Sequence, residues 1–272
     1  MSWWLTPALV DRLVAADAQL RAAVPLSRRV AFVETFPGVG SARLAAAAAT
    51  RYAVRRHAPI LLVDAAGASQ PAAAASGVGG PPAASGRGGG ALAAAGLAPA
   101  AAAAAPSQRR SHAQTLADAL DGLPTTERGV ACLDLAALAQ TGSAPPSTAD
   151  WEAHVGTVAR FLDIVVTDLG ARRVADVPAV ASASHAICVV TAPGRGAVEA
   201  AVHLARQAIE EHCPAFVAVV SPGGPVARAA ARRLARGLSA PTHVLVGARA
   251  AVELDEVAAT GLRLALSRRG HP

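Results

Sequence analysis

Residues 29–67 constrain the fold of this chain more than any other stretch. We expect an apolar strand at 30–34, then a turn with two glycines, an alanine-rich helix and a second apolar strand at 60–64. Short apolar runs on both sides of a helix are typical of parallel strands that are buried on both faces of a sheet. The stretch therefore predicts a strand–helix–strand unit of a parallel sheet.

Further apolar runs of the same kind follow at 129–135, 161–168, 186–193, 216–221 and 242–246. Most of them are separated by segments that suit helices. Aromatic residues make up only 3% of the chain, and much of its 53% hydrophobic content is alanine, which suits a sheet between alanine-rich helices. We therefore predict an α/β fold: a mostly parallel β-sheet with helices on both faces, in a three-layer Rossmann-type arrangement.

The turn after the first strand is compared with a phosphate-binding P-loop, G-x-x-x-x-G-K-[ST]. In that loop the glycines let backbone N–H groups close around phosphate, the lysine neutralises the outer phosphates, and the hydroxyl binds Mg²⁺. Here only Gly40 keeps the strict pattern, and Thr35 stands at the first glycine. Ser41 and Ala42 stand at the lysine and the hydroxyl, and the sequence contains no lysine anywhere. The loop therefore has the form of a phosphate cradle without its charges.

The order of these segments resembles the ParA/MinD family, the deviant Walker group of P-loop ATPases whose loop reads K-G-G-V-G-K-T-T. That octet corresponds to Phe36–Arg43, in which Gly38, Val39 and Gly40 match and Phe36 stands at the signature lysine. The resemblance covers the chain from about Val30 to Arg269 and implies a P-loop NTPase-like fold.

Later strands extend the resemblance. The family's second strand ends V-D-x-D, where this chain has Asp64 and then Ala66. The strand at 161–168 matches the Walker B strand, so Asp168 stands at the carboxylate that holds a Mg²⁺-bound water. The segment 186–193 is similar to the family's V-V-x-T-x-P strand end, and Ser221 stands where the family places an adenine-reading asparagine.

The resemblance implies a degenerate nucleotide site at the loop and the neighbouring strand ends. Its candidate residues are Gly38, Val39, Gly40, Ser41, Ala42, Arg43, Asp64 and Asp168. Asp168 is the candidate metal ligand, with acceptance of hydrogen bonds from the adjoining loop as the alternative. We assign no catalytic residue, because the P-loop lysine and the Mg²⁺-binding threonine are absent. Weak binding of ATP and Mg²⁺ through backbone N–H groups stays open.

The chain is expected to comprise an N-terminal helix within 1–28 and an α/β domain at 29–272. Leu9, Leu13, Ala16 and Leu20 share one face of that helix, which either packs on the domain or, with the preceding tryptophans, anchors in a membrane or a partner. Residues 68–106 consist mainly of alanine, glycine, proline and serine with one charge, and we predict a disordered insertion there.

The net charge of +6 permits contact with DNA or an anionic membrane surface. Arginines at 228, 232, 233 and 236 share a broad face of a helix expected at 226–238, and a terminal helix is expected at 254–269. A solvated surface is the alternative to DNA contact for the arginine face. For the terminal helix, the resemblance to MinD-like proteins offers contact with a membrane through an amphipathic face. The three cysteines are widely spaced, so neither a disulfide framework nor a zinc site is expected. Without a recognisable signal peptide or membrane span, a cytoplasmic protein is expected, with peripheral association at the inner face of the membrane as an option.

The resemblance implies a catalytically degenerate ParA/MinD-like protein, similar to CpaE/TadZ pilus-localisation and septum-site proteins. Such a protein would act as a positioning or scaffold factor for a secretion, pilus or division apparatus. Its partners would be proteins of a membrane-associated machine, and a homodimer is conceivable. Two alternatives are an ATP-binding ATPase of altered mechanism and a partition protein that binds DNA non-specifically.

Overall fold

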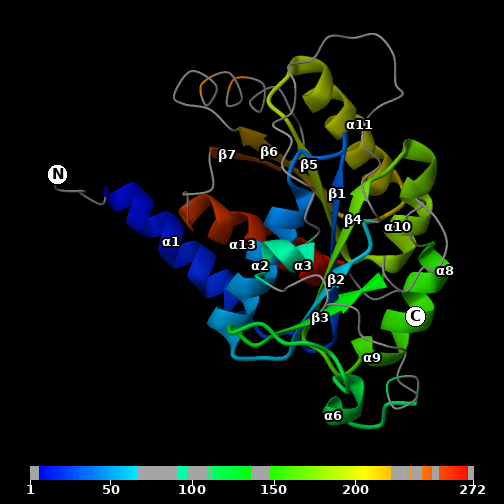
Figure 1. The fold of residues 1–272 in the computed structure, drawn as a ribbon. Coiled ribbons are helices and arrows are strands. Elements are labelled where there is room, and N and C mark those ends of the chain that lie inside the picture. Colours follow the sequence, from blue (N-terminus) through cyan, green and yellow to red (C-terminus); the bar gives the residue numbers. More distant parts are fainter. Residues whose placement is uncertain are drawn as a thin grey trace.

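The computed structural model describes residues 6–66, 91–96, 110, 112–135, 147–221, 229, 233, 241–246 and 251–268. These residues form one seven-stranded sheet in the order β3-β2-β4-β1-β5-β6-β7, and every adjacent pair of strands is parallel. The strands are β1 Arg28–Glu34, β2 Ile60–Asp64, β3 Val130–Asp134, β4 Ile164–Ala171, β5 Ala186–Thr191, β6 Ala215–Ser221 and β7 Thr242–Val246. Helices cover both faces of the sheet (Figure 1), which confirms the predicted three-layer α/β fold.

Three long helices cover one face of the sheet: α1 Pro7–Leu20, α2 Ser41–Arg56 and α13 Ala251–Ser267. Their buried residues are mostly alanine, so the helices lie close to the strands and a few large side chains fill the space between them. Tyr52 is fully buried there and donates a hydrogen bond of 2.7 Å from its hydroxyl to the carbonyl of Ala258.

The opposite face has two separate apolar clusters. Over β1, β5 and β6 lie α10 Val177–Ala183 and α11 Arg195–Glu210. Over β2, β3 and β4 lie short helices: α6 Leu116–Ala119, α8 Thr148–Trp151, a π-helical turn at Glu152–Gly156 and α9 Thr157–Ala159. A 3₁₀ turn at Val174–Asp176 leads into α10.

The N-terminal helix α1 packs on α13. Ala16 and Leu20 are buried and Leu9 and Leu13 are half-buried, as the predicted helix face requires. Arg12 makes two hydrogen bonds, of 2.6 and 2.7 Å, to the carboxylate of Glu256 on α13. The apolar face of α1 is therefore used within the protein, and Trp3 and Trp4 lie outside the described residues.

The predicted disordered insertion at 68–106 is wrong for one segment. Residues Ala91–Ala94 form the short helix α3, which contacts α2 and β2, and Ala91 is fully buried. Alanine has high helix propensity, and the small side chain of Ala91 belongs to the same apolar cluster as the alanines of α2. The rest of the insertion lies outside the described residues.

The C-terminal helix α13 begins three residues before the predicted start and supplies part of the core. Val257, Ala258, Leu262 and Ala265 are buried against α1, α2 and the sheet, so this face is not free to lie on a membrane. Of the predicted arginine helix at 226–238, only Ala229 and Arg233 are described, and both are exposed and helical. No helix in the described ranges is both long and apolar enough to cross a membrane.

Strand β4 continues past Asp168 and contains a β-bulge directly after this residue. Phe32 pairs with Asp168, but Val33 pairs with Gly170, so Leu169 is the extra residue. Gly170 has a φ of +63°, and a Cβ added there would lie 2.9 Å from the Cβ of Ala66. Glycine is therefore required here by both conformation and space.

We predict that Gly170→Ala lowers the free energy of unfolding by roughly 1–3 kcal/mol, because alanine is strained at this φ and collides with Ala66. Gly196→Ala, at the start of α11, is the matched control: its added methyl meets open space. This control should leave stability unchanged or raise it by up to about 1 kcal/mol. Urea unfolding of both variants tests the pair, and equal effects would contradict the role of the bulge.

Candidate functional site

An acidic residue lies at or near the carboxyl end of each of four neighbouring strands. Side chains alternate between the two faces of a strand, and on the face towards α2 every second residue of β1, β2, β3 and β4 is apolar. The next residue on that face is acidic in each strand. These residues are Glu34, Asp64, Asp134 and Asp168. The register pairs Asp64 with both Asp134 and Asp168. The strand ends that resemble a nucleotide site therefore form an acidic row.

The loop between β1 and α2 closes around the carboxylate of Glu34. Glu34 Oε1 accepts the N–H of Gly38 at 3.0 Å. Glu34 Oε2 accepts the N–H groups of Gly40 and Ser41 at 3.3 and 3.4 Å, and the Ser41 hydroxyl at 3.3 Å. The side chain is buried, with 6% of Glu34 exposed. The chain's own carboxylate thus takes the donors that a phosphate would take in a P-loop.

Two glycines allow this convergence of donors. Gly38 has a φ of +85° and Gly40 a φ of +118°, a region that other residues adopt only with strain. Gly40 is also the N-cap of α2, so its N–H and that of Ser41 belong to the positively polarised start of a 16-residue helix. An anion is stabilised at this position, and Glu34 supplies one.

Asp168 is the most deeply buried acid of the row. It is 0% exposed, its Oδ1 accepts the Gly170 N–H at 3.1 Å, and its Oδ2 has no partner among the described residues. Burial raises the pKa of Asp168 to about 7, and the charges of Asp64 and Glu34 add to this, while the Ser41 hydroxyl and the Gly170 N–H act in the opposite direction. The raised pKa means that this carboxyl holds its proton up to a higher pH than an exposed aspartate does, and the proton competes with a metal ion for the same oxygens.

The other predicted site residues divide into three groups. Val39 and Ala42 are half-buried and pack against the core beneath α2. Arg43 is exposed on the first turn of α2, and Phe36, at the signature-lysine position, is 51% exposed. Asp64 is buried beside the loop and accepts the Ala66 N–H at 3.3 Å. Ser221, at the end of β6, is fully buried.

Glu34 is an acceptor at the loop that the sequence does not single out, since there it is only the last residue of the strand expected at 30–34. Its position directly before a glycine loop that lacks its lysine was the available signal, because an anion-binding loop without an external counter-charge can be satisfied by a neighbouring acid. Only the three-dimensional arrangement shows that the side chain reaches back over the loop.

The residues present do not fit a nucleotide with Mg²⁺. The cradle already holds a carboxylate, Ala42 provides no hydroxyl for the metal, and the raised pKa of Asp168 favours the uncharged form of the candidate ligand. Within the described part of the chain, no group of three or more His, Cys, Asp or Glu side chains is arranged to hold a metal ion.

The raised pKa of Asp168 has a consequence for stability. Because the carboxyl binds its proton more tightly in the folded protein, its contribution to stability is complete below its ordinary pKa of 3.8 and is lost as pH rises to about 7. We predict that Asp168→Asn removes this loss, so the variant gains stability relative to the unchanged protein as pH rises through that window, by up to a few kcal/mol.

Urea unfolding at several pH values between about 4 and 8 measures this difference. Asp11→Asn, at an exposed position of α1, is the matched control and should track the unchanged protein at every pH. A constant difference between Asp168→Asn and the unchanged protein across the window would show that the carboxyl is ionised throughout.

No protein-family model matches the sequence. No curated protein matches it either. Among solved structures, the chain is similar to the MinD cell division protein of Aquifex aeolicus, with 14% identity, a TM-score of 0.50 and coverage of 90% of this chain and 99% of that one. It is also similar to a plasmid partition protein of Borrelia burgdorferi, with 11% identity, a TM-score of 0.55 and coverage of 90% and 100%. At these identities the likeness concerns the fold, and the chain has the α/β fold of the MinD and ParA P-loop ATPases.

Proposed function

We propose that this protein is a catalytically degenerate MinD/ParA-like protein that acts as a positioning or scaffold factor for a secretion, pilus or division apparatus. The observation that supports this most directly is the Glu34 carboxylate within the loop, at 3.0 Å from the Gly38 N–H. The loop keeps the shape of a nucleotide site, but its electrostatics favour an internal anion. The fold would then serve as a binding platform, and solved structures of similar fold include a cell division protein and a plasmid partition protein.

Displacing Glu34 is costly for an incoming phosphate. Hydrogen bonds to a charged group contribute about 1.5–3 kcal/mol each, and Glu34 accepts four of them from the loop and Ser41. Glu34 is also covalently tethered, so no binding entropy is lost when it occupies the loop. A phosphate would have to expel this carboxylate into an acidic surrounding without help from a lysine.

The proposed partners are proteins of a membrane-associated machine, and a second copy of the chain is an alternative partner. Phe36 supports a protein contact at the loop, because a half-exposed aromatic side chain stands where the family has a charged lysine. Peripheral association with the inner face of a membrane would then come through the partner, since the apolar face of α13 is used in the core.

We predict that the unchanged protein releases no heat with millimolar ATP and Mg²⁺ in a calorimeter. Glu34→Ala opens the loop donors and should gain weak binding of pyrophosphate, because the Gly38, Gly40 and Ser41 N–H groups become available. Glu199→Ala, at an exposed position of α11, makes the same change of charge and should gain nothing. Tight Mg²⁺-dependent ATP binding by the unchanged protein would refute a degenerate site.

The scaffold role predicts which variants matter in cells. A folded Asp168→Asn protein should place the apparatus as well as the unchanged protein does, because no metal-bound water depends on that carboxylate. Phe36→Ala should impair placement, because it removes the exposed aromatic contact. Fluorescence microscopy of the tagged apparatus in the source cells measures both. Mislocalisation with folded Asp168→Asn would argue for a working nucleotide site.

A further inference from the structure

A second feature lies on the face of the sheet opposite the loop. A pocket of about 300 Å³ opens between α8 and α10, over β1 and β4. Its lining includes Arg29, Trp151, Thr167, Arg172, Ala179 and Ser184. This volume is at the lower end of the range typical of small-molecule sites, about 300–1,000 Å³. It lies between the two apolar clusters of this face, and neither cluster fills it.

Small residues keep the pocket open. Ala175, Ala179 and Ala183 follow one another at intervals of four along the 3₁₀ turn and α10, so they lie on the same side of that segment. Ala31 of β1 lines the floor. A larger side chain at any of these positions would reach into the space between the two clusters.

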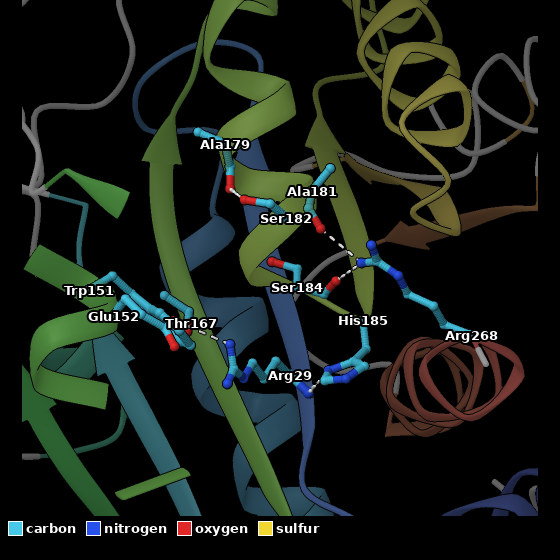
Figure 2. A network of polar contacts seen from close by, with 10 residues as sticks. All are labelled: Arg29, Trp151, Glu152, Thr167, Ala179, Ala181, Ser182, Ser184, His185 and Arg268. Carbon is cyan, nitrogen blue, oxygen red and sulfur yellow. Dashed lines mark hydrogen bonds and ion pairs between the residues drawn. The ribbon is translucent and has the colours of Figure 1, made fainter. Parts of the chain in front are cut away.

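The opposite wall is formed by an aromatic ring with polar neighbours: Trp151, Thr167 and Arg29. Trp151 is 4% exposed and donates its indole N–H to the Thr167 hydroxyl at 3.1 Å, which holds the ring in one orientation. The guanidinium of Arg29 lies over this ring at 5.0 Å from its centroid. The Arg29 main-chain N–H donates to His185 Nδ1 at 3.1 Å. Figure 2 shows Arg29 reaching from β1 towards Trp151 and Glu152.

The rim of the pocket is held by its own polar contacts. Arg268, the residue after α13, donates to the carbonyls of Ala181 and Ser184, at the end of α10 (Figure 2). These bonds join the end of α10 to the end of α13 beside Ser184, which lines the pocket.

The charge of the lining is positive. Arg29 and Arg172 line the pocket against one carboxylate, Asp176, which accepts the Arg173 N–H at 2.9 Å. Arg172 donates to the Ala65 carbonyl at 3.2 Å, and burial lowers its pKa. Arg29 pairs with Glu152 at 3.3 Å, where the Glu152 side chain is 55% exposed. An ion pair with so exposed a partner contributes at most about 1 kcal/mol, so another carboxylate can replace Glu152.

We propose that this pocket is a binding site for a small organic carboxylate with a flat apolar body. The carboxylate would pair with the Arg29 guanidinium in place of Glu152, and the apolar body would lie between Trp151 and the alanines of α10. The pocket lies on the face of the sheet opposite the acidic row, and none of its lining residues belongs to the loop between β1 and α2.

Benzoate is a suitable probe, and benzamide is its neutral counterpart of the same shape. The protein has three tryptophans, so a Trp3→Phe/Trp4→Phe variant leaves Trp151 as the sole indole. Its single indole N–H signal in the NMR spectrum then reports on the pocket. We expect benzoate to shift this signal saturably, with a dissociation constant on the order of 1 mM for a ligand of this size, and benzamide to bind about tenfold more weakly.

Two variants, one that removes a positive charge and one that removes a negative charge, test whether the carboxylate of the ligand pairs with Arg29. Arg29→Gln should weaken benzoate binding about tenfold, and Glu152→Gln should strengthen it, because it removes the competing carboxylate. Ala179→Leu should fill the pocket and abolish binding, and Ser182→Leu is its control, on the same helix at an exposed position outside the lining. No saturable shift in the folded reporter, equal binding of benzamide, or weaker binding by Glu152→Gln would each overturn the proposal.

Discussion

The four hydrogen bonds accepted by Glu34 organise the centre of this structure. They hold the loop after β1 in a conformation with two left-handed glycines, and they provide a negative charge for the start of α2. In a P-loop ATPase the phosphate groups of the nucleotide supply that charge. Here the charge belongs to the polypeptide, so the loop is satisfied without a ligand, and the same fold can be stable as a platform.

The missing lysine, the position of Glu34 and the raised pKa of Asp168 are related through the electrostatics of the acidic row. Glu34, Asp64 and Asp168 lie at neighbouring strand ends, beside a loop that has no lysine. The structure answers this by tying Glu34 to the loop donors and by raising the pKa of the buried Asp168 to about 7. The Glu34 carboxylate makes a bound phosphate less favourable, because it takes the N–H donors that the phosphate would take. The raised pKa of Asp168 instead lowers the repulsion among the acids of the row.

The two faces of the sheet have different roles in this view. The face towards α2 is closely packed with alanine and a few large residues, and it ends in the acidic row. The other face is divided into two clusters, one beneath the short helices over β2, β3 and β4 and one beneath α10 and α11. The pocket between Trp151 and α10 follows from that division.

The strands, the parallel α/β fold and the absence of a lysine from the loop could all be predicted from the sequence, because apolar runs and residue types are local properties. The sequence also predicted the face of α1 and the position of Asp168. Tertiary structure alone decided that Ala91 packs in the core, that α13 is buried, that Glu34 reaches back into its own loop, and that Arg29 meets Trp151. Each of these depends on which segments lie side by side and on the direction of a side chain, and neither can be read from the spacing of residues along the chain.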